Sequence, residues 1–221
     1  MSSSILSVHE VCKHYRSGAK MVRAVDGVSF TIERGRSLCV TGASGAGKST
    51  LLQLLGGLDS PTSGSVMLDG IDIYKLPDSG RAKIRNKRIG FVFQFFHLLP
   101  EFSAVENVML PAMIGGRRAR DKAVRLLEAV GLGGRIDHKP SEMSGGESQR
   151  AAIARALIND PDVLLCDEPT GNLDSSNSES IYKLLFGLKS ESNTAIVIVT
   201  HDASLSKRTD QSIHLKDGRL V

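Results

Sequence analysis

The spacing of hydrophobic and polar positions changes along the chain, and each spacing predicts a different element. Val28, Phe30 and Ile32 alternate with polar residues, as in a strand with one buried face. Ser37–Thr41 is a short apolar run that ends at a glycine-rich loop, and residues 49–58 then have the pattern of a helix. The first part of the chain therefore predicts strands, followed by a strand, a loop and a helix.

The middle of the chain, from about residue 95 to residue 140, has a different character. Ala123, Leu126, Leu127 and Val130 recur at helical spacing, which predicts an amphipathic helix. Glycine-rich stretches punctuate this region. We expect a helical subdomain inserted into an α/β core.

Helices and strands alternate in the last third of the chain. The pattern predicts helices over residues 149–158 and 177–188, strands over 163–166 and 195–200, and two short strands around Lys216–Gly218. This alternation is typical of a parallel sheet covered by helices. The predicted fold class is therefore α/β.

Length and charge narrow the possibilities. The 221 residues suffice for one large domain, or for one domain with a subdomain. No apolar run approaches the roughly 20 residues of a membrane span, and the chain start lacks a secretion signal, so we expect a cytosolic protein.

The net charge of +4 is mild. The basic cluster Arg81–Arg88 fits either an anionic partner or, as we favour, a solvated helix face.

The three cysteines, Cys12, Cys39 and Cys166, show no spacing typical of a metal or redox motif. Cys39 and Cys166 lie in apolar runs, which predicts that they are small buried hydrophobic residues.

A glycine-rich loop between a predicted strand and a predicted helix matches the phosphate-loop pattern of nucleotide hydrolases. Its glycines allow backbone N–H groups to curl around phosphates. We expect Lys48 to reach the β- and γ-phosphates and Ser49 to bind Mg²⁺. The loop residues are Gly42, Ala43, Ser44, Gly45, Ala46, Gly47, Lys48, Ser49 and Thr50.

Two carboxylates end the apolar run that begins at Val163. Asp167 is a candidate Mg²⁺ ligand, and Glu168 is a candidate general base for an attacking water. Alternatively, the two acids cap the start of a helix. His201 follows another predicted strand, where ligands of α/β sheets bind, and it could sense the γ-phosphate. Gln94 ends an apolar run and could contact Mg²⁺ and water.

A second glycine-rich turn, at residues 143–150, also opens a predicted helix. A helix N-terminus with free N–H groups suits an anion, yet one nucleotide does not need two phosphate cradles from one chain. We interpret the second cradle as serving a nucleotide that another subunit holds. Its candidate contacts are Ser144, Gly145, Gly146 and Glu147.

Taken together, these motifs resemble the nucleotide-binding subunits of ABC transporters over essentially the whole chain. They occur in the family order: an aromatic residue that stacks on adenine (Tyr15), Walker A (Gly42–Thr50), the Q-loop (Gln94), the signature (Ser144–Gln149), Walker B (Val163–Glu168), the D-loop (Gly171–Asp174) and the switch histidine (His201).

The resemblance implies the ABC ATPase fold. That fold has a P-loop NTPase core with a mainly parallel sheet, an N-terminal antiparallel β subdomain and an inserted α-helical subdomain. The implied core spans residues 1–94 and 160–221, and the helical and signature subdomain spans 95–159. The family's sheet order places the strand before His201 between those of Cys39 and Cys166, which argues against a disulfide between them.

The resemblance further implies an ATPase that uses ATP and Mg²⁺ and couples hydrolysis to transport. Two copies would pair head to tail with two ATP molecules between them, and Asp174 would couple the sites.

ABC proteins that act on nucleic acid typically carry two cassettes or a long coiled coil. This chain has one signature and no sustained heptad run, so we expect no nucleic-acid partner. A scaffold that binds nucleotide but hydrolyses little is another alternative.

Residues 51–64 and 93–102 resemble the LolD group, the ATPases of bacterial lipoprotein-releasing complexes. The implied partners are two membrane-spanning subunits similar to LolC and LolE, and the implied location is peripheral, on the cytoplasmic face of the inner membrane. A MacB-like efflux pump and an FtsE-like cell-division complex are the alternatives within the family.

We expect an exposed patch that accepts a helix of a membrane subunit, although some of its residues could fill the seam between core and helices. The patch comprises Phe95, Phe96, Leu98, Leu99 and Phe102.

Overall fold

The N-terminal part of the chain forms an antiparallel sheet. The computed structural model describes residues 4–18 and 20–221, so residues 1–3 of the chain start, where no secretion signal is expected, lie outside it. The sheet consists of β2 (Lys20–Glu33), β1 (Ser4–Ser17), β4 (Ser63–Leu68) and β5 (Ile71–Asp72), in that spatial order. All three pairings are antiparallel, which confirms the predicted N-terminal β region.

The second sheet is mainly parallel, as the alternation of helices and strands predicts. Its order is β10 (Arg219–Leu220), β9 (Gln211–Lys216), β3 (Ser37–Thr41), β8 (Ala195–Thr200), β7 (Val163–Asp167) and β6 (Ile89–Val92). Only the short β10 runs antiparallel to its neighbour. The ranges of β3 and β8 match the predicted strands.

Cys39 and Cys166 cannot form a disulfide, because β8 lies between their strands. Both residues are register partners of Ile198, and both are buried free thiols. Two strand spacings of about 4.8 Å separate their backbones, more than the roughly 7 Å that a disulfide tolerates between Cα atoms. The implied strand order is therefore confirmed.

Helices cover both faces of the parallel sheet. One face packs on α1 (Lys48–Leu55) and, with it, on the antiparallel sheet. The opposite face packs on α5 (Gly145–Leu157) and α6 (Ser175–Ser192). Successive residues of each strand thus serve different cores: Leu165 belongs to the α1 side and Cys166 to the α5 and α6 side. This alternation explains the continuous apolar runs of the central strands.

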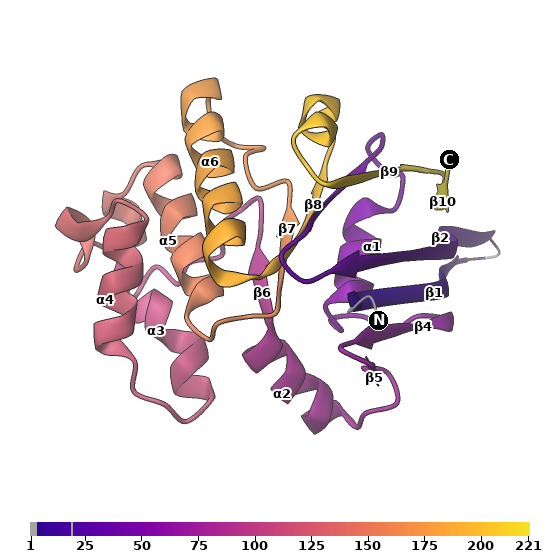
Figure 1. The fold of residues 1–221 in the computed structure, drawn as a ribbon, viewed down its shortest axis with the longest axis horizontal. Helices are drawn as coiled ribbons and strands as arrows, with labels where there is room; N and C mark the ends of the chain where they lie inside the picture. Colours follow the sequence, from indigo (N-terminus) through magenta and orange to yellow (C-terminus); the bar gives the residue numbers. More distant parts are fainter. Residues whose placement is uncertain (1–3, 19) are drawn as a thin grey trace.

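A third apolar cluster holds the middle of the chain together. It joins α3 (Ala104–Ile114), α4 (Arg120–Ala129) and α5, and includes Ala123, Leu127 and Val130 of the predicted amphipathic helix. Short 3₁₀ turns at Gly133–Arg135 and Pro140–Glu142 connect α4 to α5. These helices gather at one end of the molecule, and the antiparallel strands lie at the other (Figure 1).

The basic cluster of residues 81–88 lies on α2 (Asp78–Arg88), a helix without buried residues. Several of its cations have partners within the chain. Arg88 pairs with Asp69 and Asp162, and Arg85 donates to the carbonyl of Gly57. These contacts fit the favoured interpretation, a solvated helix face. Among the helices of the described residues, none has both the length and the apolar character needed to cross a bilayer.

Candidate active site

The phosphate-loop sequence connects the carboxyl end of β3 to the start of α1. Gly47 is the N-cap of α1 with φ of 100°, and α1 has no side-chain cap and no acid in its first turn. A Cβ atom on Gly47 would lie 2.0 Å from the carbonyl oxygen of Ala24, so only glycine fits there. The first N–H groups of α1 are therefore left for an anion.

Lys48 is buried inside this loop. Its ammonium donates to the carbonyl oxygens of Gly42 at 2.9 Å and Ala43 at 3.1 Å. Both hydrogen-bond acceptors are neutral, and the Asp167 carboxylate lies close enough to attract this cation. The loop thus presents one positive charge and free backbone donors to the same space, which suits a polyphosphate.

Asp167 ends β7 beside the phosphate loop. Ser49 Oγ donates to Asp167 Oδ1 at 3.1 Å. Burial raises the pKa of Asp167 above its ordinary value, and the hydrogen bond from Ser49 opposes this shift. A hydroxyl and a carboxylate at this distance are the oxygen donors that Mg²⁺ prefers, and a bound cation would offset the cost of the buried charge.

Glu168 and His201 meet at the ends of neighbouring strands. His201 Nδ1 lies 3.0 Å from Glu168 Oε2, and Thr200 Oγ1 donates to the same oxygen at 3.1 Å. The Glu168 side chain is 16% exposed, whereas that of His201 is 72% exposed. Glu168 has a left-handed φ of 44°, and its N–H donates to the carbonyl of Val199. A positioned carboxylate at the edge of an open site can accept a proton from water.

The phosphate loop, Glu168 and His201 line one open hollow of about 640 Å³. Gln94 also lines it, and the side chain of Gln94 lies 3.4 Å from that of Asn172 in the segment before α6. The structure therefore brings together residues from four distant parts of the sequence that the motifs singled out separately.

Two walls of the hollow are not predicted by the motifs. One wall consists of residues of β2, namely Val22, Arg23 and Ala24. The other wall is the β9–β10 turn, with Asp217 and Gly218. The two are linked, because Asp26 N–H donates to the carbonyl of Gly218 at 2.8 Å. The glycines at positions 42 and 47 are local signs of these approaches, because a Cβ on Gly42 would lie 2.3 Å from the carbonyl oxygen of Leu215 in β9.

Tyr15 lies on β1 and is not among the residues that line the hollow. Its hydroxyl donates to Asp59 Oδ2 at 2.8 Å, and the Lys13 ammonium lies 5.0 Å from its ring centroid. Burial is the main cause that raises the pKa of Tyr15, and Thr50 of the phosphate loop also contacts its hydroxyl. The ring thus lies beside the loop, with its hydroxyl already paired.

The second glycine-rich turn lies away from this hollow. Ser144 is the N-cap of α5, where its Oγ accepts from Glu147 N–H at 3.3 Å and its N–H donates to Glu147 Oε2 at 2.8 Å. Arg135 Nε donates to the other carboxylate oxygen of Glu147. The Ser144 hydroxyl also interacts with this carboxylate, and the contacts from Ser144 are the main cause that lowers the pKa of Glu147. None of these residues lines the hollow.

The apolar stretch after Gln94 is only partly exposed. Phe95 is 67% exposed, and Leu99 and Phe102 are also exposed. Phe96 and Leu98 are half-buried, and Leu98 packs on the helical cluster. The exposed part of the expected patch is therefore Phe95, Leu99 and Phe102, while Leu98 contributes to the seam between core and helices. Exposed and half-buried residues alternate from Phe95 to Leu99, and Phe96 and His97 both have a left-handed backbone conformation.

The chain is similar to known proteins in both sequence and fold. The family model described as "ABC transporter" matches residues 25–171. The chain is 50% identical over 220 residues to the lipoprotein-releasing system ATP-binding protein LolD of Shewanella frigidimarina (strain NCIMB 400), covering 98% of this chain and 92% of that protein.

Solved structures resemble the whole chain. A dimeric post-hydrolysis state of the ATP-binding cassette MJ0796, bound to ADP and Pi, superposes with a TM-score of 0.90 at 40% identity, covering 97% of this chain and 96% of that one. The cbiO1 protein of Clostridium perfringens, part of the ABC transporter complex cbiONQ, gives a TM-score of 0.87 at 31% identity, covering 99% and 87%.

Proposed function

Because this chain belongs to the ABC transporter family of ATP-binding subunits, which are ATPases, we propose that it powers the release of lipoproteins from a bacterial inner membrane. The observation that carries this proposal is the 50% identity, over 98% of the chain, to the ATP-binding protein of a lipoprotein-releasing system. The efflux and cell-division alternatives have no comparable support.

In this proposal the hollow at the phosphate loop binds ATP. Lys48 and the N–H groups from Gly42 to Thr50 hold the phosphates, and Tyr15 stacks on adenine from the side of β1. Ser49, Gln94 and Asp167 hold Mg²⁺, which neutralises phosphate charge when bound. The support is the contact of 3.1 Å between Ser49 and Asp167, together with the cation of Lys48, whose hydrogen bonds go to neutral carbonyls.

Glu168 is the proposed general base, and His201 is the proposed contact to the γ-phosphate. Glu168 accepts a proton from the attacking water, while His201 and Thr200 hold its carboxylate in place. The distances of 3.0 Å and 3.1 Å to Glu168 Oε2 support these roles, and Gln94, which lines the same hollow, contributes to placing the water.

The catalytic unit in this proposal is a head-to-tail pair of identical chains. Ser144, Gly145, Gly146 and Glu147 of one copy complete the nucleotide site of the other, and Asp174 couples the two sites. Two observations support it: the signature turn lies outside the hollow of its own chain, and the similar MJ0796 cassette is dimeric with bound ADP and Pi. Glu147 acts through Ser144 and Arg135 rather than by direct phosphate contact.

The same proposal divides the chain into a core of residues 1–94 and 160–221 and a helical subdomain of residues 95–159. The separate apolar cluster of α3, α4 and α5 supports this division. The exposed Phe95, Leu99 and Phe102 lie where the two parts meet. They form the proposed contact with two membrane-spanning subunits similar to LolC and LolE, which would keep the chain on the cytoplasmic face of the membrane.

Reconstitution tests the proposed function. The chain is purified with its membrane subunits and inserted into proteoliposomes that carry a triacylated lipoprotein. We expect ATP to release the lipoprotein to a soluble acceptor, and Glu168→Gln to bind ATP without release. ATP-driven export of a small molecule without lipoprotein release would instead favour an efflux pump.

A further inference from the structure

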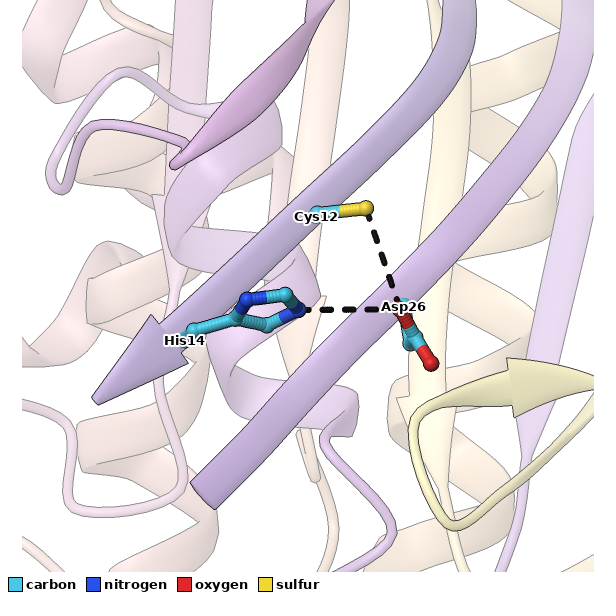
Figure 2. A group of neighbouring side chains, drawn as sticks. All are labelled: Cys12, His14 and Asp26. Atoms are coloured by element: carbon cyan, nitrogen blue, oxygen red, sulfur yellow. Dashed lines mark hydrogen bonds and ion pairs between the residues drawn. The ribbon is translucent and has the colours of Figure 1, made fainter. Parts of the chain in front are cut away.

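Three side chains with metal-binding chemistry converge on the antiparallel sheet, apart from the proposed Mg²⁺ site. Cys12 and His14 project from β1 towards Asp26 on β2 (Figure 2). One ligand atom of each lies within 4.8 Å of those of the other two, and this is the one such group of three within residues 4–18 and 20–221.

Strand geometry explains the convergence. Cys12 and His14 are two residues apart on one strand, so their side chains point to the same face. The register pairs Val11 with Val28 but Lys13 with Val25, so Cys12 lies opposite both Asp26 and Gly27. This extra residue is a β-bulge, a feature that changes where a side chain points. The bulge directs Asp26 towards the other two.

The separations of the ligand atoms suit a single small cation. Asp26 Oδ1 lies 3.6 Å from His14 Nε2 and 3.9 Å from Cys12 Sγ. Tetrahedral zinc, with bonds of about 2.0–2.3 Å, places its ligand atoms roughly 3.3–3.7 Å apart. The ligand atoms of Cys12 and His14 lie within 4.8 Å of each other, so shifts of up to about 1 Å would close the site.

One atom of the cluster has no hydrogen bond and only a long contact, of 3.6 Å, with Asp26 Oδ1. His14 Nε2 is buried and makes no hydrogen bond. Buried polar atoms without a partner are rare and need an explanation. A cation bound between Nε2, Oδ1 and Sγ would supply the missing interaction.

The surroundings hold the ligands in position. Arg219 donates from Nε at 2.9 Å and from Nη2 at 2.7 Å to Asp26 Oδ2, which leaves Oδ1 for the cluster. Gly27 N–H donates to Cys12 Sγ at 3.2 Å, a contact that stabilises a thiolate. Such outer contacts typically orient metal ligands.

We propose that Cys12 Sγ, His14 Nε2 and Asp26 Oδ1 form a Zn²⁺ site with a fourth position open to water. A thiolate, an imidazole and a carboxylate form a ligand set that favours Zn²⁺ over Mg²⁺ or Ca²⁺. Binding releases the thiol proton to solvent, and the two anionic ligands balance the cation. The His14 and Asp26 side chains are 24% and 15% exposed, which gives the ion a path of entry.

This site does not depend on the proposed ATP hydrolysis, but it lies close to the nucleotide site. Asp26 N–H donates to the carbonyl of Gly218, and Gly218 N–H donates to the carbonyl of Ala46 at 3.1 Å. Two backbone hydrogen bonds thus connect the Zn²⁺ site to the phosphate loop.

Titration with Co²⁺ as a spectroscopic probe tests the site in the reduced, untagged, nucleotide-free chain. We expect a thiolate-to-cobalt charge-transfer band that saturates at a single equivalent and is displaced by Zn²⁺. Cys12→Ser abolishes the band, and His14→Gln and Asp26→Asn each weaken binding about tenfold or more. His9→Gln, which removes an exposed histidine of the same strand, leaves it unchanged. Absence of the band, or wild-type binding by both His14→Gln and Asp26→Asn, overturns the proposal.

A second measurement needs no variant. Alkylation of Cys12 in the wild-type chain is followed by peptide mass spectrometry, with the buried Cys39 and Cys166 as internal references. Zn²⁺ at micromolar concentration should slow modification of Cys12 in a saturable manner, and Mg²⁺ should not. Equal alkylation with and without Zn²⁺ contradicts the site.

Discussion

His201 Nδ1 lies 3.0 Å from Glu168 Oε2, at the ends of the neighbouring strands β8 and β7. The same carboxylate oxygen accepts a hydrogen bond from Thr200 Oγ1, and the backbone N–H of Glu168 donates to Val199. The carboxylate is therefore held by the adjoining strand, whereas the exposed imidazole faces the hollow. This arrangement separates a fixed carboxylate from an exposed imidazole that is free to move.

Replacement of Glu168 by Gln should lower the ATPase rate by about 10²–10⁴-fold, because the amide cannot accept the proton of the attacking water. ATP binding should persist, since Lys48 and the loop N–H groups are unchanged. Steady-state phosphate release and nucleotide binding by equilibrium dialysis measure the two effects. Glu128→Gln, on an exposed face of α4, is the matched control. An ATPase rate near wild type would reject Glu168 as the base.

Pairs of inactive variants should complement each other if the signature acts across a dimer. Lys48→Ala removes the phosphate-loop cation, and Ser144→Arg blocks the signature. In a mixed head-to-tail dimer, one site combines Lys48 of one chain with Ser144 of the other, so mixing should restore ATPase activity. If the two motifs act within one chain, the mixture stays as inactive as its components.

Phe95→Asp and Leu99→Asp should weaken association with the membrane subunits while ATP binding stays intact, because both side chains are exposed in the free chain. Co-purification from detergent and nucleotide binding are the two readouts. Val221→Asp, an equally exposed position at the far end of the molecule (Figure 1), is the control. Normal co-purification of both variants would exclude this patch as the contact.

Arg155→Met should destabilise the loop that follows Gln94. The half-buried guanidinium donates to the carbonyls of Phe96 at 2.7 Å and His97 at 2.5 Å, and burial lowers the pKa of Arg155. Removal leaves both carbonyls without a partner, at a cost of about 1–3 kcal/mol. Urea unfolding measures the change, and limited proteolysis should locate new cleavage near residues 95–99. Arg150→Met on the same helix should change neither readout.

Asp174 should contribute stability that depends on pH. Its hydrogen bond from Asn177 N–H at the start of α6 lowers the pKa of Asp174 from 3.8 to about 2. A lowered pKa in the folded state means that the contribution is complete above pH 3.8 and is lost as the pH falls through about 2. Asp174→Asn keeps a side-chain acceptor but does not titrate. The difference in unfolding free energy between the two proteins should shrink across this window, and a constant difference would contradict the assignment.

The order of apolar and polar residues along the chain predicted those strands and helices whose limits depend on nearby residues. Ser37–Thr41 and Ala195–Thr200 are strands with the predicted ends, because continuous apolar runs are buried on both faces of a parallel sheet. The predicted helix at residue 149 begins earlier, at Gly145, because Ser144 and Glu147 form a capping box. The spacing of Ser144 and Glu147 was a visible sign of this start. Likewise α1 ends at Leu55 rather than 58, before Gly56 and Gly57.

Residues that meet through long-range pairing could not be predicted in this way. Val22–Ala24 and Gly218 reach the hollow because β2 and the β9–β10 turn lie against the phosphate loop. Likewise, the exposed members of the apolar stretch depend on Arg155, some sixty positions away, which fixes the backbone of Phe96 and His97. The assigned catalytic and binding roles stay predictions until the experiments above are done.

The sequence by itself determined the family, the fold class and the phosphate loop, since these depend on ordered motifs and on hydrophobic periodicity within single elements. Only the tertiary structure decided that Cys12, His14 and Asp26 form one cluster. The reason is the irregular register of the β1–β2 pairing, which shifts between Val11 and Lys13 and again between Lys13 and His14. Register between strands is set by the packing of the whole sheet, and a shift of one residue changes which side chains meet.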